Sequence, residues 1–233
     1  MTEFINVSLR RREEDAKRLI SQSSPVIIWP CREGILILAA NKDRLENRIH
    51  EIFDRIACVT LGGFSAGTRL WQHAVYQAGI EGYSLSKGDV HCRIIIKQIS
   101  SLLSDSFHDF KPGPVFGAEA IFAEVAPERQ DDYLAYVNLH GFIETFDKAK
   151  IFGQLKTPDQ NMRDNNRFNN SRAEKRLSEI WDPDSPIDDV QKSLQNEDSL
   201  AGLFQSTRIE SVLLERKMVK ETKFNSVFKR LNN

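Results

Sequence analysis

The chain has 233 residues, of which 40% are hydrophobic, and these values fit one large domain, or one domain with an appendage, around a continuous core. Its 32 basic and 33 acidic side chains leave a formal net charge of −1, which argues against an electrostatic nucleic-acid binder or a polybasic membrane surface. No apolar run approaches the roughly 20 residues of a membrane-spanning helix, and the charged N-terminal stretch lacks the apolar segment of a secretion signal. We therefore expect a cytoplasmic protein without nucleic-acid or membrane partners.

Cysteine and histidine give no sign of a disulfide framework or a metal site. Cys31, Cys58 and Cys92 are an odd and scattered set, which favours reduced thiols. The dipeptide His91-Cys92 has no second Cys/His cluster at ligand spacing, and the other histidines are isolated. We expect no metal and no cofactor.

The chain is predicted to begin with a mobile tail and a polar helix. Residues 1–7 have little to hold them and form the tail. From Ser8, a candidate N-cap, to about Gln22, a thin apolar stripe recurs at helical spacing between charged faces. A helix this polar cannot bury itself alone, so we expect it to pack against a neighbour.

Two pairs of strands follow the helix. Val26–Pro30 and Ile35–Ala39 are continuously apolar arms of a β-hairpin, a pattern typical of strands that are covered on both faces. A second pair is predicted at Ile49–Phe53 and Arg55–Leu61, ending at Gly62-Gly63.

Two helices and three strands come next. Leu70–Ala78 carries one helical apolar face that stops at Gly79 or Gly82, and Ser86–Asp89 has capping-box spacing before a second helix. The strands are predicted at Val115–Val125, Tyr133–Asn138 and Phe142–Phe152.

The last third of the chain changes in character. Residues 154–185 are rich in asparagine and charge, and we interpret them as a surface loop followed by a helix across Ser171–Trp181. Ser185 and Pro186 open another helix, with an acidic residue in its first turn. A final strand at Arg208–Leu214 and a basic amphipathic C-terminal helix at 223–231 complete the order.

This order of elements predicts the fold class. Helix pairs that separate and follow blocks of strands suit an α+β, four-layer αββα sandwich of two stacked antiparallel sheets flanked by helices. We expect a single domain from residue 8 to residue 233, with a divergent segment at 154–205.

Four stretches, taken together in their order and spacing, resemble proteasome α subunits, especially the actinobacterial type. They are Glu33–Ala39 with Asn41, Arg48–Ile56, Gly82–Ser84 with Asp89-Val90, and Arg208–Arg216 followed by Phe224–Leu231. The likeness covers about residues 8–153 and 206–231. It implies the fold of N-terminal-nucleophile hydrolases.

The resemblance also implies that this fold is used without its chemistry. Active relatives expose a threonine at the start of the first strand and activate it through its own amine and a nearby lysine. Here the matching start is Ser23-Ser24-Pro25, the acidic partner's position is Ala40, and the lysine's position is Arg48, whose guanidinium is a poor proton acceptor. We therefore expect no catalytic residue.

Site residues follow from the resemblance by position. The gate residues that would close the entrance of the ring are Met1, Thr2, Glu3, Phe4, Ile5, Asn6, Val7 and Ser8. Arg48 matches a lysine that pairs with the C-terminal carboxylate of a ring ATPase or another activator, and Gly62 and Gly63 match a glycine turn near the incoming peptide. The plain alternatives are a frayed terminus, a surface ion pair of Arg48 and an ordinary hairpin end.

The sequence thus predicts a non-catalytic α-type subunit of a bacterial proteasome core particle. Its partners would be further copies in a heptameric ring, β-type subunits, a ring ATPase or other activator, and protein substrates in transit. Two alternatives stay open: an active N-terminal-nucleophile hydrolase processed before Ser23 or Ser24, and a self-assembling ring without a β partner. The Asn165–Asn170 cluster matches nothing in the family.

Overall fold

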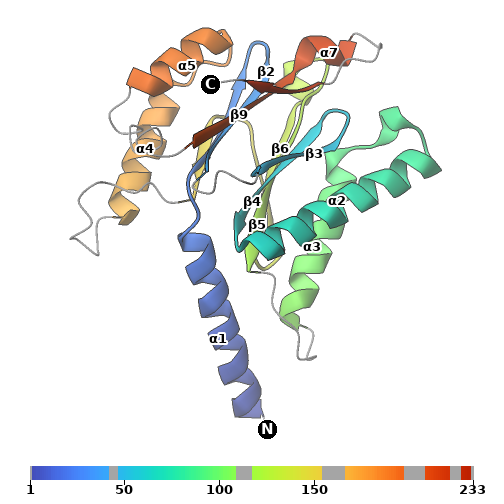
Figure 1. Ribbon diagram of the computed structural model, residues 1–233, viewed down its shortest axis with the longest axis vertical. Helices are drawn as coiled ribbons and strands as arrows, with labels where there is room; N and C mark the ends of the chain where they lie inside the picture. Colours follow the sequence, from blue (N-terminus) through green and yellow to red (C-terminus); the bar gives the residue numbers. More distant parts are fainter. Residues whose placement is uncertain are drawn as a thin grey trace. The chain divides into compact units, whose positions relative to one another are not determined.

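The computed structural model describes residues 2–41, 47–108, 117–153, 166–196, 208–220 and 227–231. It is an α+β protein with two five-stranded antiparallel sheets and helices that accompany each of them (Figure 1). The chain divides into two compact units, each with one of the sheets. Unit 1 comprises Met1–Ser23, His50–Glu124 and Tyr133–Phe146, and unit 2 comprises Ser24–Ile49, Val125–Asp132 and Asp147–Asn233. Each unit thus pairs a sheet with helices, as the predicted αββα fold requires of each half.

The sheet of unit 1 has the strand order β3-β4-β5-β6-β7. Its strands are β3 (Ile49–Phe53), β4 (Ile56–Gly62), β5 (Ala118–Glu124), β6 (Tyr133–Val137) and β7 (Ile143–Phe146). The central strand β5 is buried at every position and pairs antiparallel with both β4 and β6. The predicted second strand pair and the first two strands of the later block are confirmed.

Three helices belong to unit 1. They are α1 (Thr2–Ser21), α2 (Phe64–Ser84) and α3 (Cys92–His108), with a short 3₁₀ helix η1 (Lys87–Asp89) between the last two. Leu70 and Ala74 of α2 and Ile95 and Ile99 of α3 share one apolar cluster with Phe122 of β5. Figure 1 shows α2 and α3 together over this sheet. The apolar periodicity of both segments therefore predicted the buried faces correctly.

The ends of these helices differ from the prediction. Because α1 begins at Thr2, Ser8 lies inside the helix and is not its N-cap. α2 continues through both expected stop positions to Ser84, and Gly82 packs so closely on Phe53 that a Cβ there would lie 2.9 Å from the ring. The Ser86 hydroxyl bonds the Asp89 carboxylate at 2.6 Å in η1, so it does not cap α3. At these helix ends, tertiary packing outweighs the local capping and glycine signals in the sequence.

The sheet of unit 2 has the strand order β10-β9-β2-β1-β8. Its strands are β1 (Val26–Cys31), β2 (Gly34–Asn41), β8 (Lys150–Phe152), β9 (Arg208–Glu215) and β10 (Phe228–Leu231). β1 and β2 are buried at every position, which confirms the hairpin of covered strands. Gly34 turns the hairpin at φ +152°, and a Cβ there would lie 1.9 Å from the Leu214 carbonyl oxygen, so the position requires glycine.

Helices α4 (Asn166–Ile180) and α5 (Ile187–Asn196) of unit 2 confirm the two helices predicted before the last strand. The short 3₁₀ helix η2 (Arg129–Asp131) and helix α7 (Arg216–Lys220) were not predicted. Leu177 of α4 and Leu194 of α5 pack in one apolar cluster with Trp29 and Leu36 of the sheet. The indole of Trp181 donates to the Pro30 carbonyl at 3.1 Å, which fixes the end of α4 to β1.

Two predictions about strands and helices are wrong. The single strand expected across Phe142–Phe152 is two strands, β7 and β8, which belong to different sheets. The described part of the expected C-terminal helix at 223–231 contains β10, which pairs antiparallel with β9 from Phe228 to Leu231. Residues 223–226 lie outside the described part of the chain. A helical stripe over so few residues does not outweigh the hydrogen bonds that an adjacent strand offers.

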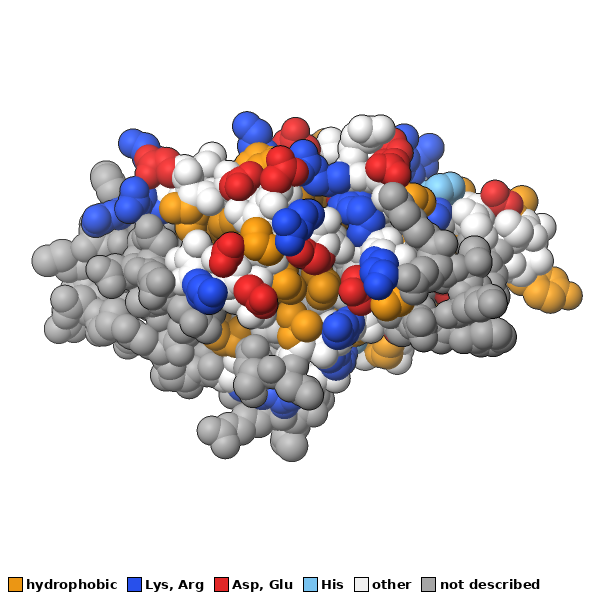
Figure 2. Space-filling model, turned by 90° about the horizontal axis from the view of Figure 1, so that it is seen from above, with side chains coloured by type: hydrophobic (Ala, Val, Ile, Leu, Met, Phe, Trp, Pro, Cys, Tyr) orange, Lys and Arg blue, Asp and Glu red, His pale blue; other side chains and the backbone are white. Residues whose placement is uncertain are grey.

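Charges of both signs are mixed on one face of the protein. On the face drawn in Figure 2, acidic and basic side chains alternate around apolar ones, with no broad area of one sign among the residues shown in colour.

None of the described helices has both the length and the apolar character needed to cross a membrane.

Candidate functional site

The positions that the resemblance assigned to a lost catalytic centre meet in unit 2. Arg48 stands just before β3, and its Nη1 donates to the Ala40 carbonyl at 2.6 Å and to the Ser24 carbonyl at 3.1 Å. Ala40 lies near the end of β2 and is 2% exposed. We call Ser24, Ala40 and Arg48 the Arg48 corner. Three positions chosen from sequence alone are thus neighbours in space.

The Arg48 corner offers a fixed cation rather than a proton acceptor. Burial lowers the pKa of Arg48 to about 10, while the nearby Glu210 carboxylate acts in the opposite direction. At neutral pH the guanidinium therefore stays protonated. Ala40 supplies no carboxylate, and the carbonyl of Ser24 is already an acceptor for Arg48. Of the parts that activate an N-terminal nucleophile, none is present at these three positions.

A buried carboxylate that sequence reasoning missed binds the backbone of Arg48 and Ile49 within unit 2. The backbone N–H of Arg48 donates to Glu210 Oε2 at 2.7 Å, and that of Ile49 donates to Oε1 at 3.3 Å. Arg230 of β10 pairs with the same carboxylate and also donates to the Ile49 carbonyl at 3.0 Å. Glu210 lies on β9 and is 6% exposed. The only sequence signal was an acidic residue inside an apolar strand, which demands a partner.

The predicted glycine turn belongs to unit 1 and has internal partners. The Gly62 N–H donates to the Ser23 hydroxyl at 2.6 Å, and the Gly63 N–H donates to the Gly117 carbonyl at 2.9 Å. Gly62 adopts φ +110°, and a Cβ there would lie 2.2 Å from the Gly117 oxygen. The Ser23 hydroxyl in turn donates to the Leu19 carbonyl at 3.4 Å. The turn therefore joins the end of β4 to the end of α1, and the predicted approach of an activator peptide stays a prediction.

The gate residues are the first turns of α1. Thr2–Ser8 are helical, and Met1 lies outside the described residues. Farther along α1, Glu13 bonds Lys17 at 2.6 Å, which lowers the pKa of Glu13 together with the nearby His140 at 3.4 Å. The contact with His140 ties the second half of the helix to the β6–β7 turn. The closing of a pore by the first half of α1 stays a prediction.

Comparison with known proteins identifies relatives. The proteasome subunit alpha of Arthrobacter sp. (strain FB24) is 30% identical over 146 residues, covering 62% of this chain and 61% of that protein. Its counterpart in Geodermatophilus obscurus is 27% identical over 158 residues (67% and 54%), and that of Nocardia farcinica 28% over 153 residues (64% and 58%). These matches confirm the resemblance to proteasome α subunits. No family model matches the chain. The matched residues cover between 54% and 61% of the length of these three curated relatives.

A second buried carboxylate, Glu124, holds the start of a helix, and the cysteines are buried. Glu124 of β5 accepts from the Cys92 N–H at 2.8 Å and from Arg55 Nε at 3.0 Å, so a residue distant in sequence caps α3. Burial raises the pKa of Cys92 well above that of an ordinary thiol, and it raises the pKa of Cys31 to about 11. No group of three His, Cys, Asp or Glu side chains that could hold a metal lies in the described part of the chain.

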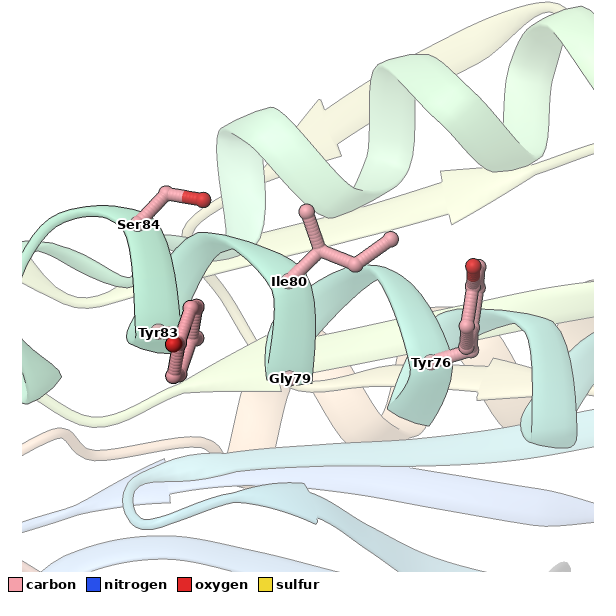
Figure 3. A pocket seen from close by; sticks show the side chains of 5 residues that line it. All are labelled: Tyr76, Gly79, Ile80, Tyr83 and Ser84. Atoms are coloured by element: carbon pink, nitrogen blue, oxygen red, sulfur yellow. The ribbon is translucent and has the colours of Figure 1, made fainter.

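One exposed apolar surface on α2 was also missed. Tyr76, Ile80 and Tyr83 lie on one helix face and are 64%, 41% and 94% exposed. With Gly79 and Ser84 they line a shallow depression of about 330 Å³ (Figure 3). Their spacing at i, i+4 and i+7 was the available signal. Apolar area of this kind is suited to contact with another chain.

Proposed function

We propose that the chain is a non-catalytic α-type subunit of a bacterial proteasome core particle, located in the cytoplasm. In this proposal it forms a homo-oligomeric, heptameric outer ring that gates the entry of protein substrates and stacks on β-type subunits. The similarity to proteasome α subunits supports the family, and the Arg48 corner carries the argument against catalysis.

The absence of catalysis rests on the chemistry of three positions. A hydrolase of this fold needs a free amine at the nucleophile and a group that accepts its proton. Ser24 is joined to Ser23 by a peptide bond, and Arg48 remains a cation that donates to two carbonyl oxygens. Ala40 cannot supply the missing carboxylate. The hydrolytic work of the particle is therefore assigned to the β-type subunits.

Docking of an activator is proposed at Arg48, Gly62 and Gly63. A guanidinium can hold a terminal carboxylate through two charge-assisted hydrogen bonds, and Arg48 keeps its charge despite burial. The Gly62-Gly63 turn lacks side chains, so an incoming peptide backbone could approach it closely. The proposed gate is the segment Thr2–Ser8 together with Met1.

Co-expression with a β-type subunit from the same cell tests the assembly. Native mass spectrometry and negative-stain imaging should show stacked rings that contain both chains. Lone rings or monomers would favour the self-assembling alternative. Peptide hydrolysis by the isolated chain, with loss of the residues before Ser23 or Ser24, would favour the active hydrolase instead.

A matched pair of arginine variants tests the docking. Arg48→Ala should abolish the stimulation of protein degradation by a ring ATPase, while hydrolysis of short peptides by the particle persists. Arg32→Ala is the control, because the Arg32 side chain is 63% exposed and its described contacts are with the neighbouring Glu33 carboxylate. Equal stimulation of both variants would refute a docking role for Arg48.

A further inference from the structure

We propose that Glu210 and Arg230 are positioning residues, which hold Arg48 in the orientation that binding of a terminal carboxylate requires. The inference rests on the proposed function, because it adds two residues to the proposed docking of an activator. All three residues belong to unit 2. Neither Glu210 nor Arg230 needs to touch the bound peptide, since Glu210 acts through the backbone at Arg48 and Arg230 acts through Glu210.

The backbone at Arg48 is fixed by a charged acceptor. Glu210 Oε2 accepts from the Arg48 N–H at 2.7 Å, and Glu210 Oε1 accepts from the Ile49 N–H at 3.3 Å. The Glu210 side chain is only 5% exposed, so water does not readily take its place as the acceptor. One buried carboxylate therefore sets the direction in which the Arg48 side chain leaves the backbone.

The other end of the Arg48 side chain is fixed as well. Its Nη1 donates to the carbonyl oxygens of Ser24 and Ala40, at 3.1 and 2.6 Å. Glu210 of β9 lies opposite Ala39 of β2, so it is close to the position of the acceptor Ala40 in the neighbouring strand (Figure 1). A guanidinium binds a carboxylate through two hydrogen bonds only when its plane has the right direction. The anchors at both ends of the side chain favour one such direction.

Arg230 of β10 holds the Glu210 carboxylate in turn. It pairs with Glu210 Oε1 and also donates from Nη2 to the Ile49 carbonyl at 3.0 Å. Ile49 is therefore bound at its N–H by Glu210 and at its carbonyl by Arg230. Removal of Arg230 would leave a buried carboxylate with its two backbone donors and without this cation, so we expect its position to be less well determined.

Two effects of Glu210 on a docked carboxylate oppose each other. Burial lowers the pKa of Arg48, and the negative charge of Glu210 acts in the opposite direction, so the two charged groups interact. As a charge alone, Glu210 would repel an incoming carboxylate, and its removal would strengthen binding. As an anchor of the backbone, its removal would weaken binding. The sign of the change in Glu210→Gln therefore distinguishes the positioning role from a simple electrostatic one.

The test measures how strongly the assembled full-length chain prefers a terminal carboxylate. Two fluorescent synthetic peptides carry the C-terminal sequence of a ring ATPase from the same cell, one with a free carboxylate and one with a carboxamide. Fluorescence anisotropy gives a dissociation constant for each peptide. The unmodified chain should bind the carboxylate peptide more tightly than the carboxamide peptide, and Arg48→Ala should abolish this preference.

The variants of the two positioning residues should lose the same preference. Glu210→Gln and Arg230→Ala should each weaken binding of the carboxylate peptide about tenfold, because a misdirected guanidinium loses one of its two charged hydrogen bonds. Binding of the carboxamide peptide should stay unchanged, whereas a general loss of folded structure would weaken both peptides. In the Arg48→Ala chain neither substitution should weaken binding further, because each of them acts through Arg48.

Lys229→Ala is the matched control for Arg230→Ala. Lys229 is an exposed cation and the neighbour of Arg230 on β10, so its side chain points to the opposite face of the strand. Lys229→Ala should bind the carboxylate peptide like the unmodified chain. Arg230→Lys keeps a cation for Glu210 and should restore the affinity for this peptide to within about threefold of the unmodified value. Native mass spectrometry confirms equal assembly of the chains compared.

The results separate the inference from the proposed function. If the unmodified chain binds both peptides alike, or Arg48→Ala keeps the preference, the proposed docking is wrong and the inference is overturned with it. If Arg48→Ala loses the preference but Glu210→Gln binds the carboxylate peptide as well as the unmodified chain or better, the docking stands and the positioning role is refuted. Should Glu210→Gln fail to assemble, Arg230→Ala decides the question, and an affinity equal to that of Lys229→Ala refutes the inference.

Discussion

Replacing Glu210 by glutamine should destabilise unit 2 by removing a buried charge that binds Arg48, Ile49 and Arg230. The carboxylate lies on β9, accepts the backbone N–H groups of Arg48 and Ile49 at the start of β3, and pairs with Arg230 of β10. The Glu210 side chain is 5% exposed, whereas that of Arg230 is 41% exposed. After the loss of the charge, Arg230 can therefore still be hydrated, whereas the groups buried around residue 210 cannot.

The magnitude follows from these contacts. A glutamine oxygen can keep one of the two backbone N–H donors, but its NH₂ group faces the other, and an unpaired buried donor costs about 1–3 kcal/mol. Arg230 loses a charged hydrogen bond, worth about 1.5–3 kcal/mol when buried. Because the Arg230 side chain is partly exposed, water can replace the lost hydrogen bond. The contribution of this bond to the loss of stability therefore falls to about 1 kcal/mol. We expect Glu210→Gln to lower the free energy of unfolding by about 2–4 kcal/mol.

Urea unfolding followed by tryptophan fluorescence measures this loss. Trp29 and Trp181 both report on unit 2, and a slope of about 2 kcal/mol/M predicts a midpoint lower by about 1–2 M. The control is Glu179→Gln, which breaks an exposed i, i+3 pair with Arg176 on α4 and should cost less than about 0.5 kcal/mol. A midpoint for Glu210→Gln no lower than that of the control would refute the reasoning.

Three further predictions concern titration and processing. Because burial raises the pKa of all three cysteine thiols, they should react with iodoacetamide only after unfolding, as counted by mass spectrometry. Burial also raises the pKa of Glu119 above its ordinary value, so the free energy of unfolding falls as pH rises through the interval between its unfolded and folded pKa values. Glu119→Gln should therefore gain stability relative to the unmodified chain as pH rises, and Glu14→Gln should not. The intact mass should show no cleavage before Ser23 or Ser24.

The strands were predictable wherever a continuous apolar run carried the information. Val26–Cys31 and Gly34–Asn41 are buried at every position, so their sequence alone shows that both faces are covered. The split of Phe142–Phe152 between two sheets was not predictable, because a strand's partner is chosen by distant residues. The same holds for Phe228–Leu231, whose helical spacing also fits a short strand that pairs with β9.

The candidate site was predictable only in part. The resemblance selected Ser24, Ala40 and Arg48, and the structure brings these three together. Glu210 was missed because it lies 162 residues from Arg48 in sequence, and no local pattern links a carboxylate to a backbone N–H at that distance. A charged residue inside an apolar strand does predict a buried partner, but it does not identify which one.

Arg48 shows why a shared fold does not by itself decide the chemistry of a site. The sheets are held by apolar runs that do not depend on which side chain fills the corner. A lysine amine under the same burial would have its pKa lowered from a smaller starting value, toward the range of a general base. The Arg48 guanidinium retains a pKa of about 10 and stays a donor at neutral pH. Its binding capacity is thus for carbonyl and carboxylate oxygens, and this is the property that docking of a terminal carboxylate would use.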